Sequence, residues 1–172
     1  MLKHDLERKV INVAISDLRF SRKGELLKTT LGSCVSVVLY ANPKKSDSMV
    51  CSMSHYLLPT PSHVNDKERL PFRFGDVIIE YQINKMLKSG LKVEDLYAKL
   101  AGGATMFPLK KKEQIYDIGN ANVEIAKKIL KTHRITITGE NTGYTQGRSI
   151  LFDPETKKLR VHIFGDNTEE VI

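Results

Sequence analysis

Cys34 and His55 are the residues of this chain whose types and surroundings could provide a nucleophile and its base. Cys34 stands in the segment LGSCV, where Gly32 and Ser33 suit a close approach of the backbone. The amides that follow a thiol in such a turn can point at a developing oxyanion. An imidazole within reach of a thiol activates it for attack on a carbonyl carbon. The pair therefore predicts a cysteine-dependent hydrolase.

Two neighbouring segments must position these side chains, and both have the composition of β-strands. Residues 34–40 and 49–57 are rich in β-branched and apolar types, and the polar residues 41–48 between them include a proline. This pattern predicts a β-hairpin. With the turn at the middle of the connection, antiparallel pairing places Cys34 directly opposite His55, with both side chains on one face. A connection of this length can also slip by two residues.

Other interpretations of the cysteines and of a neighbouring serine stay open. A free cysteine is commonly a small buried hydrophobic residue, and this applies to Cys34 as well as to Cys51. Cys51 shares a strand face with His55, but four residues of strand separate the two by about 13 Å, too far for contact. Ser33 has no second histidine placed to activate it.

Composition is that of an ordinary folded protein. The chain has 172 residues, of which 41% are hydrophobic and 27% charged, which predicts one domain over residues 1–172. The first residues form no apolar signal segment, and no stretch is long enough for a membrane span, so we expect a cytoplasmic protein without membrane insertion. Two cysteines without metal-ligand spacing predict neither a disulfide framework nor a metal site. No cofactor is expected.

The charge balance favours acidic partners. Lys and Arg number 27 against 20 Asp and Glu, a formal net charge of +7. Nucleic acid is not the expected partner, because the lysines are scattered, Trp is absent and no nucleic-acid-binding motif is present.

The remaining elements predict an α+β fold. Residues 59–75 are polar and contain three prolines, which predicts a long surface loop of the kind that can act as a lid. Amphipathic helices are expected over residues 76–89, capped by Asp76, and over residues 120–133. About seven strands, mostly in hairpins, complete a layered α/β/β single domain in which two main helices cover one face of a sheet. His133 ends the apolar stripe of the second helix and is expected to be structural.

Five segments, in this order, resemble the chemoreceptor glutamine deamidase family (CheD). They run from about Thr29 to Val161 and are LGSCVSVVLY, SHYLLP, AKLAGGATMF, IGNANVEIAKKIL and ENTGYTQGRSILFDPETKKL. The resemblance implies hydrolysis of glutamine side-chain amides to glutamate on the cytoplasmic helices of chemotaxis receptors, with related hydrolysis of glutamyl methyl esters. It also implies that Cys34 is the nucleophile and His55 the base.

The same resemblance implies a threonine that orients the imidazole and a regulatory partner. Thr29 and Thr30 both stand just upstream of the cysteine, and we prefer Thr29. Phe107 resembles the family's contact for the phosphatase CheC, although a buried position under the preceding turn is an equal alternative. A non-catalytic chemotaxis regulator that binds CheC or receptors is the alternative function.

Overall fold

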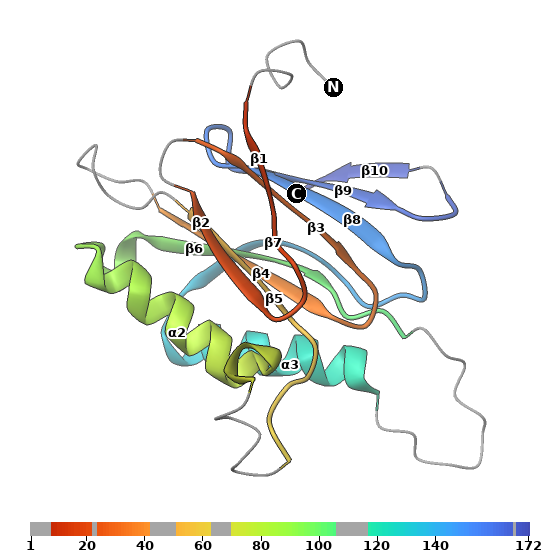
Figure 1. Cartoon of the computed structure of the whole chain (residues 1–172), viewed down its shortest axis with the longest axis horizontal. Helices are drawn as coiled ribbons and strands as arrows, with labels where there is room; N and C mark the ends of the chain where they lie inside the picture. Colours follow the sequence, from red (N-terminus) through yellow and green to blue (C-terminus); the bar gives the residue numbers. More distant parts are fainter. Residues whose placement is uncertain (1–7, 22–23, 42–50, 63–69, 106–116, 167) are drawn as a thin grey trace.

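Two five-stranded sheets and two α-helices make up the described part of the chain. The structure is a computed structural model that describes residues 8–21, 24–41, 51–62, 70–105, 117–166 and 168–172. The predicted α+β class and its α/β/β layering are confirmed, since both helices lie on one side of the paired sheets (Figure 1). None of the described helices is long and apolar enough to cross a membrane.

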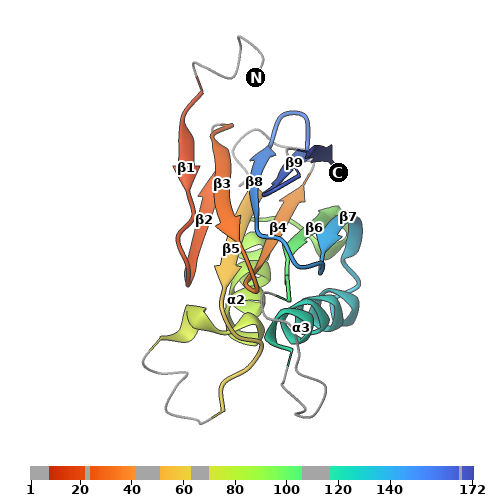
Figure 2. The same ribbon diagram turned by 90° about the vertical axis from the view of Figure 1, so that its right-hand side faces the viewer.

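The two sheets differ in their strand order and in what covers them. The outer sheet has the order β1-β3-β8-β9-β10 and comprises Val10–Asn12, Leu26–Leu31, Arg148–Asp153, Lys158–Ile163 and Thr168–Val171. The central sheet has the order β2-β5-β4-β6-β7 and comprises Asp17–Ser21, Cys51–Tyr56, Val35–Ala41, Leu96–Gly102 and Thr136–Thr142. Helices α2 (Gly75–Lys88) and α3 (Ile118–Thr132) pack against the central sheet (Figure 2).

Apolar side chains form one layer on each face of the central sheet. The layer under the helices includes Val35, Val37 and Leu39 of β4, and the layer between the sheets includes Val38 and Tyr40 of the same strand. All seven residues of β4 and all six of β5 are buried. Strands covered on both faces bury nearly continuous apolar runs, which matches the composition of these segments.

Both helices lie close to where the sequence predicts them, although one of the expected caps is wrong. Helix α2 spans Gly75–Lys88, but its N-cap is Phe74, with no side-chain cap, and not Asp76. Helix α3 begins after Asp117, whose side chain accepts a hydrogen bond from the backbone N–H of Asn120 at 3.1 Å. That bond satisfies one of the amides left unpaired at a helix start.

Four segments differ from the expectation. Strands β2 and β10 were not predicted, and β7 continues to Thr142, into a segment expected to be a loop. Within the predicted loop 59–75, the described part contains a short 3-10 helix at Pro71–Arg73, and Leu58 pairs with Phe74 in an isolated bridge. The short edge strands carry charged residues, which hides their strand character in the sequence.

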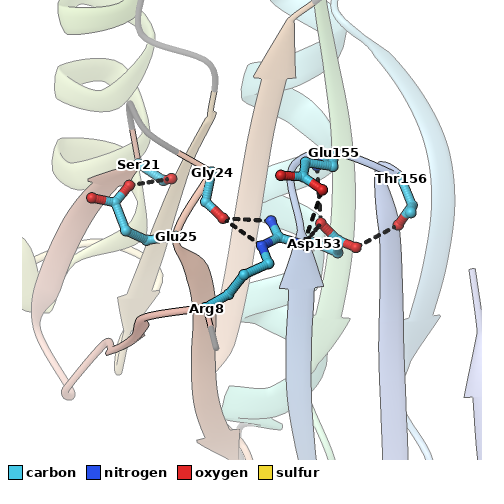
Figure 3. Close-up of polar contacts among 7 residues, drawn as sticks. All are labelled: Arg8, Ser21, Gly24, Glu25, Asp153, Glu155 and Thr156. Carbon is cyan, nitrogen blue, oxygen red and sulfur yellow. Dashed lines mark hydrogen bonds and ion pairs between the residues drawn. The ribbon is translucent and has the colours of Figure 1, made fainter. Parts of the chain in front are cut away.

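A polar cluster fastens the start of the described chain to the outer sheet (Figure 3). The guanidinium of Arg8 donates to Asp153 at 2.8 Å and to the carbonyl of Gly24. Asp153 also accepts from the backbone N–H of Glu155 and the hydroxyl of Thr156. Burial raises the pKa of Asp153, but these donors and the Arg8 charge outweigh it, so the pKa lies below its ordinary value.

Candidate active site

The register of β4 and β5 differs by two residues from the expected hairpin. His55 pairs with Ser36, and Val35 pairs with Tyr56, so Cys34 is not directly opposite His55. The expected register is therefore wrong. Every residue of both strands is buried, so the hydrophobic pattern does not distinguish registers that differ by two. Ser36, now opposite His55, is fully buried, and its hydroxyl has no hydrogen-bond partner among the described residues.

A two-residue shift leaves both side chains on the same face of the central sheet. Cys34 packs in the layer between the sheets, with Val38 and Met53. His55 follows Met53 by two residues and therefore points into the same layer. Cys34 lies where the chain crosses from β3 in the outer sheet to β4 in the central sheet, so the thiol sits at the end of the space between the sheets.

Thr29 contacts His55 across the two sheets. Its hydroxyl donates to the carbonyl oxygen of Val13 at 2.7 Å and lies 2.8 Å from Nδ1 of His55. Because the hydroxyl proton is used by Val13, the hydroxyl oxygen accepts the Nδ1 proton. Thr30, the alternative, is exposed on the other face of β3. Of the two threonines, only Thr29 is placed to orient the imidazole.

This contact determines the tautomer of His55. With the proton on Nδ1, the neutral ring carries a lone pair on Nε2, the state required of a general base. Nε2 is buried and has no hydrogen-bond partner among the described residues, so it does not bond to the Cys34 thiol. Burial lowers the pKa of His55 and outweighs the Val13 carbonyl, which raises it. The imidazole is therefore neutral near pH 7.

The two cysteines have different environments. Burial raises the pKa of the Cys34 thiol, while its own backbone N–H acts in the opposite direction, and the residue is 8% exposed. Cys51 is fully buried, and burial raises its pKa to about 12. The resting pair is therefore a neutral thiol and a neutral imidazole. Catalytic hydrogen bonds commonly tighten only when substrate binds, so the missing bond at rest does not by itself exclude a role of the pair in catalysis.

Residues 102–104 at the end of β6, here called the glycine turn, hold the backbone of residues 32–34, here called the cysteine turn. The N–H of Gly103 donates to the carbonyl of Cys34 at 2.8 Å, and the N–H of Ala104 donates to the carbonyl of Gly32 at 2.9 Å. Gly102 has a φ of +108°, and a Cβ there would lie 2.2 Å from the Cys34 carbonyl oxygen. This close approach holds the backbone of Cys34 in place.

Comparison with known proteins connects this geometry to a family. A family model described as CheD chemotactic sensory transduction matches residues 57–163. A protein of Oceanobacillus iheyensis named "Probable chemoreceptor glutamine deamidase CheD" is 37% identical over 157 residues, 91% of this chain and 92% of that protein. A Clostridium botulinum protein of the same name is 34% identical over 169 residues, 96% and 100% of the two chains. The chain belongs to the CheD family.

Asn122 of this CheD-family chain contacts the segments next to Cys34 and His55, and sequence reasoning missed it. It lies on α3, and its side-chain amide donates to the carbonyls of Ser33 at 3.0 Å and Leu57 at 2.9 Å. The hydroxyl of Tyr56 donates to the backbone carbonyl of Asn122 at 2.6 Å. The one signal in the sequence was its position within the segment IGNANVEIAKKIL, which resembles the family. The apolar spacing of the helix gave no signal, because Asn122 is a polar residue.

Other predicted residues of the CheD-family chain lie away from this site or outside the described structure. His133 contacts the carboxylate of Glu80 at 2.9 Å, which links the two helices, as its expected structural role requires. Phe107 lies outside the described residues. Among those that are described, no three or more His, Cys, Asp or Glu side chains gather where they could hold a metal ion.

Proposed function

We propose that this chain hydrolyses the side-chain amides of specific glutamines on the cytoplasmic domains of chemotaxis receptors, producing glutamate and ammonia. The names of the relatives supply the reaction and the substrate class. The single observation that carries the mechanism is the contact between Thr29 and Nδ1 of His55, which leaves Nε2 as a base on the face occupied by Cys34.

In the first half of the reaction, Cys34 Sγ attacks the amide carbon while its proton passes to His55 Nε2. The carbonyl π electrons move to oxygen and form a tetrahedral oxyanion. As the C–N bond breaks, the imidazolium returns the proton to nitrogen, and ammonia leaves a thioester on Cys34. Thr29 holds the Nδ1 proton throughout and so keeps the ring in the orientation that serves the thiol.

In the second half, His55 removes a proton from water as its oxygen attacks the thioester carbon. The C–S bond then breaks, the sulfur takes back a proton from His55, and the product is the glutamate side chain. A glutamyl methyl ester would follow the same route with methanol as the leaving group. The residues of the chain supply every proton transfer in this scheme.

Mass spectrometry of a purified receptor cytoplasmic fragment tests the proposal. Replacement of NH2 by OH adds about one dalton per modified glutamine, so wild-type protein should increase the fragment mass while Cys34→Ala and His55→Ala should not. Thr30→Val, a surface change on the strand that carries Thr29, is the control and should act as wild type does. An unchanged fragment with wild-type protein would contradict the enzymatic proposal.

The alternative is a non-catalytic regulator that binds the phosphatase CheC or receptors. The absence of a hydrogen bond from the thiol to Nε2 of His55, within the described structure, is the observation that favours it. Binding of the receptor fragment without any mass change would support this alternative. A role of Phe107 in contacting CheC stays a prediction, tested by pull-down with Phe107→Ala.

A further inference from the structure

The ladder between β4 and β5 ends at the pair formed by Val35 and Tyr56, so His55 lies within the ladder and Cys34 lies immediately beyond it. Beyond this pair, the side-chain amide of Asn122 connects the segment that precedes β4 to the segment that follows β5. Its nitrogen donates one proton to the carbonyl of Ser33 and the other to the carbonyl of Leu57, at 3.0 and 2.9 Å. One side chain therefore joins the residue before Cys34 to the segment after His55.

We propose that Asn122 is a positioning residue for the hydrolysis, because its amide sets the placement of the Cys34 peptide relative to the strand that carries His55. This inference rests on the proposed function. The Ser33 carbonyl and the Cys34 N–H belong to one planar peptide group, so holding the carbonyl fixes the direction of the N–H beside the thiol. Asn122 does not touch the reacting atoms in this scheme.

Among side chains of asparagine's size, the amide is the neutral group that meets both requirements at this position. Both acceptors are carbonyl oxygens, so the group between them must donate twice and accept from neither. A carboxylate at the same place would bring its own acceptor oxygens against the two carbonyl oxygens. An aliphatic side chain would leave both carbonyls without this donor. Either loss is costly, because the Asn122 side chain is fully buried and its two hydrogen bonds to the carbonyls would be removed.

The neighbourhood of Asn122 supports a role in alignment. Its backbone carbonyl accepts from the hydroxyl of Tyr56, which lies between His55 and Leu57 in sequence. Gly119, one turn earlier on α3, lies so close to the glycine turn that a Cβ there would be 2.6 Å from the carbonyl oxygen of Gly103. The start of α3 thus contacts β5, which carries His55, and also contacts the cysteine turn and the glycine turn.

Gln82 on α2 provides a matched control within the same molecule. It is also a fully buried amide on a helix that faces the central sheet. Its nitrogen likewise donates twice, to the carbonyl of Val37 at 3.1 Å and to the hydroxyl of Ser52 at 3.0 Å. The side-chain oxygens of both amides have no partner among the described residues. Gln82 therefore reproduces the stabilising contacts of Asn122 away from the thiol.

The experiment compares Asn122→Leu with Gln82→Leu in a Cys51→Ala background, which leaves Cys34 as the single thiol. Three quantities are measured for each protein: the midpoint of urea unfolding, kcat and KM for deamidation of a receptor fragment, and the pH dependence of Cys34 alkylation by iodoacetamide. We expect both variants to lose stability. Asn122→Leu alone should also lose kcat by about 10- to 100-fold with little change in KM, as misplacement of a reacting group does.

The alkylation profile gives a readout that does not depend on substrate. Asn122→Leu should shift the profile to higher pH, because a released Ser33–Cys34 peptide no longer holds its N–H beside the sulfur, whereas Gln82→Leu should leave the profile in place. If wild-type protein deamidates no fragment, the proposed function fails while this profile still tests Asn122. Asn122→Ala, which removes both donors and adds no bulk and no opposing acceptor, serves where the leucine variant does not fold, and it should also lose kcat.

The inference is overturned by a specific result. That result is an Asn122→Leu or Asn122→Ala protein that unfolds at lower urea than the parent, as Gln82→Leu does, and still keeps the parent's kcat within about two-fold and the parent's alkylation profile. A loss confined to KM would overturn it equally, because alignment of the thiol and the base acts on the chemical step.

Discussion

The hydroxyl of Thr29 lies 2.8 Å from Nδ1 of His55 while donating its own proton to the Val13 carbonyl. Thr29→Val keeps the shape but removes the acceptor for Nδ1–H, so the tautomer with a free Nε2 is no longer favoured. We expect kcat for receptor deamidation to fall by about 10- to 100-fold, less than the loss caused by removing the base itself. Thr29→Ser should retain most of the activity. Equal activity of the valine and serine variants would contradict an orienting role.

The pH dependence of deamidation follows from the neutral state of His55. Burial lowers the pKa of His55 below its ordinary 6.5, so the neutral ring persists as the pH falls. Since kcat/KM of the free enzyme requires the unprotonated base, its acid limb should have a midpoint below pH 6.5. Steady-state rates between pH 4.5 and pH 8 measure this. A midpoint above 6.5 would indicate an imidazolium stabilised by the thiolate before substrate binds.

The two thiols should react at very different rates in the folded protein. Cys34 is 8% exposed with a raised pKa, whereas Cys51 is fully buried with a pKa of about 12. Because the thiolate is the reactive form, iodoacetamide should modify Cys34 slowly at pH 7 and faster as the pH rises, and should leave Cys51 unmodified until the protein unfolds. Intact mass and peptide mapping over a time course check this. Modification of Cys51 before Cys34 would be inconsistent with the described packing.

Gly102 offers a steric test of how the cysteine turn is held. Its φ is +108° and an added Cβ would lie 2.2 Å from the Cys34 carbonyl oxygen, whereas Gly90 has a φ of +95° with open space around it. Gly90→Ala should cost about 1 kcal/mol from backbone strain alone. Gly102→Ala should cost more than about 2 kcal/mol and should also reduce kcat, because the clash moves Cys34. Urea unfolding with parallel assays separates the two effects.

The contact between Arg8 and Asp153 predicts a stability that depends on pH. Both side chains are mostly buried, at 12% and 11% exposure, and the folded pKa of Asp153 is lowered. A lowered folded pKa gives stability that is present above the unfolded pKa and is lost as the pH falls through the folded value. Arg8→Met should therefore cost about 1–3 kcal/mol at pH 7 and less at low pH.

Arg19 is the control for this change, because it contacts Asp17 at a solvent-exposed position. Arg19→Met should alter the free energy of unfolding by no more than about 0.5 kcal/mol. Urea unfolding of both variants at pH 7 and pH 3 gives the comparison. A cost of Arg8→Met that is unchanged at pH 3 would show that packing, and not the ion pair, accounts for it.

The sequence predicts the layering and the face of the site better than its register. Alternation along β4 and β5 places Cys34 and His55 on one face, and a two-residue shift preserves that result. The register itself depends on the connection between the strands and on contacts with β2 and β6, which the two segments do not encode. Helix α2 was predictable because its apolar spacing is regular and Gly90 follows it.

The contacts that complete the site could not be predicted from local patterns. Val13 and Asn122 act through a backbone carbonyl and a buried amide, at sequence separations of 16 from Thr29 and 89 from Ser33. A backbone carbonyl carries no residue-type signal, and one asparagine near a helix start resembles an ordinary capping residue. Only the packing of α3 on the central sheet brings Asn122 to the cysteine turn.

Thr29 belongs to the outer sheet and His55 to the central sheet, so their hydrogen bond spans the boundary between two separately paired β-structures. Neither sheet alone can define which imidazole nitrogen bears the proton. Sliding of one sheet over the other by a single side-chain width would release the ring. The proposed orientation of the imidazole is consequently a property of the two sheets docked together, and neither sheet provides it by itself.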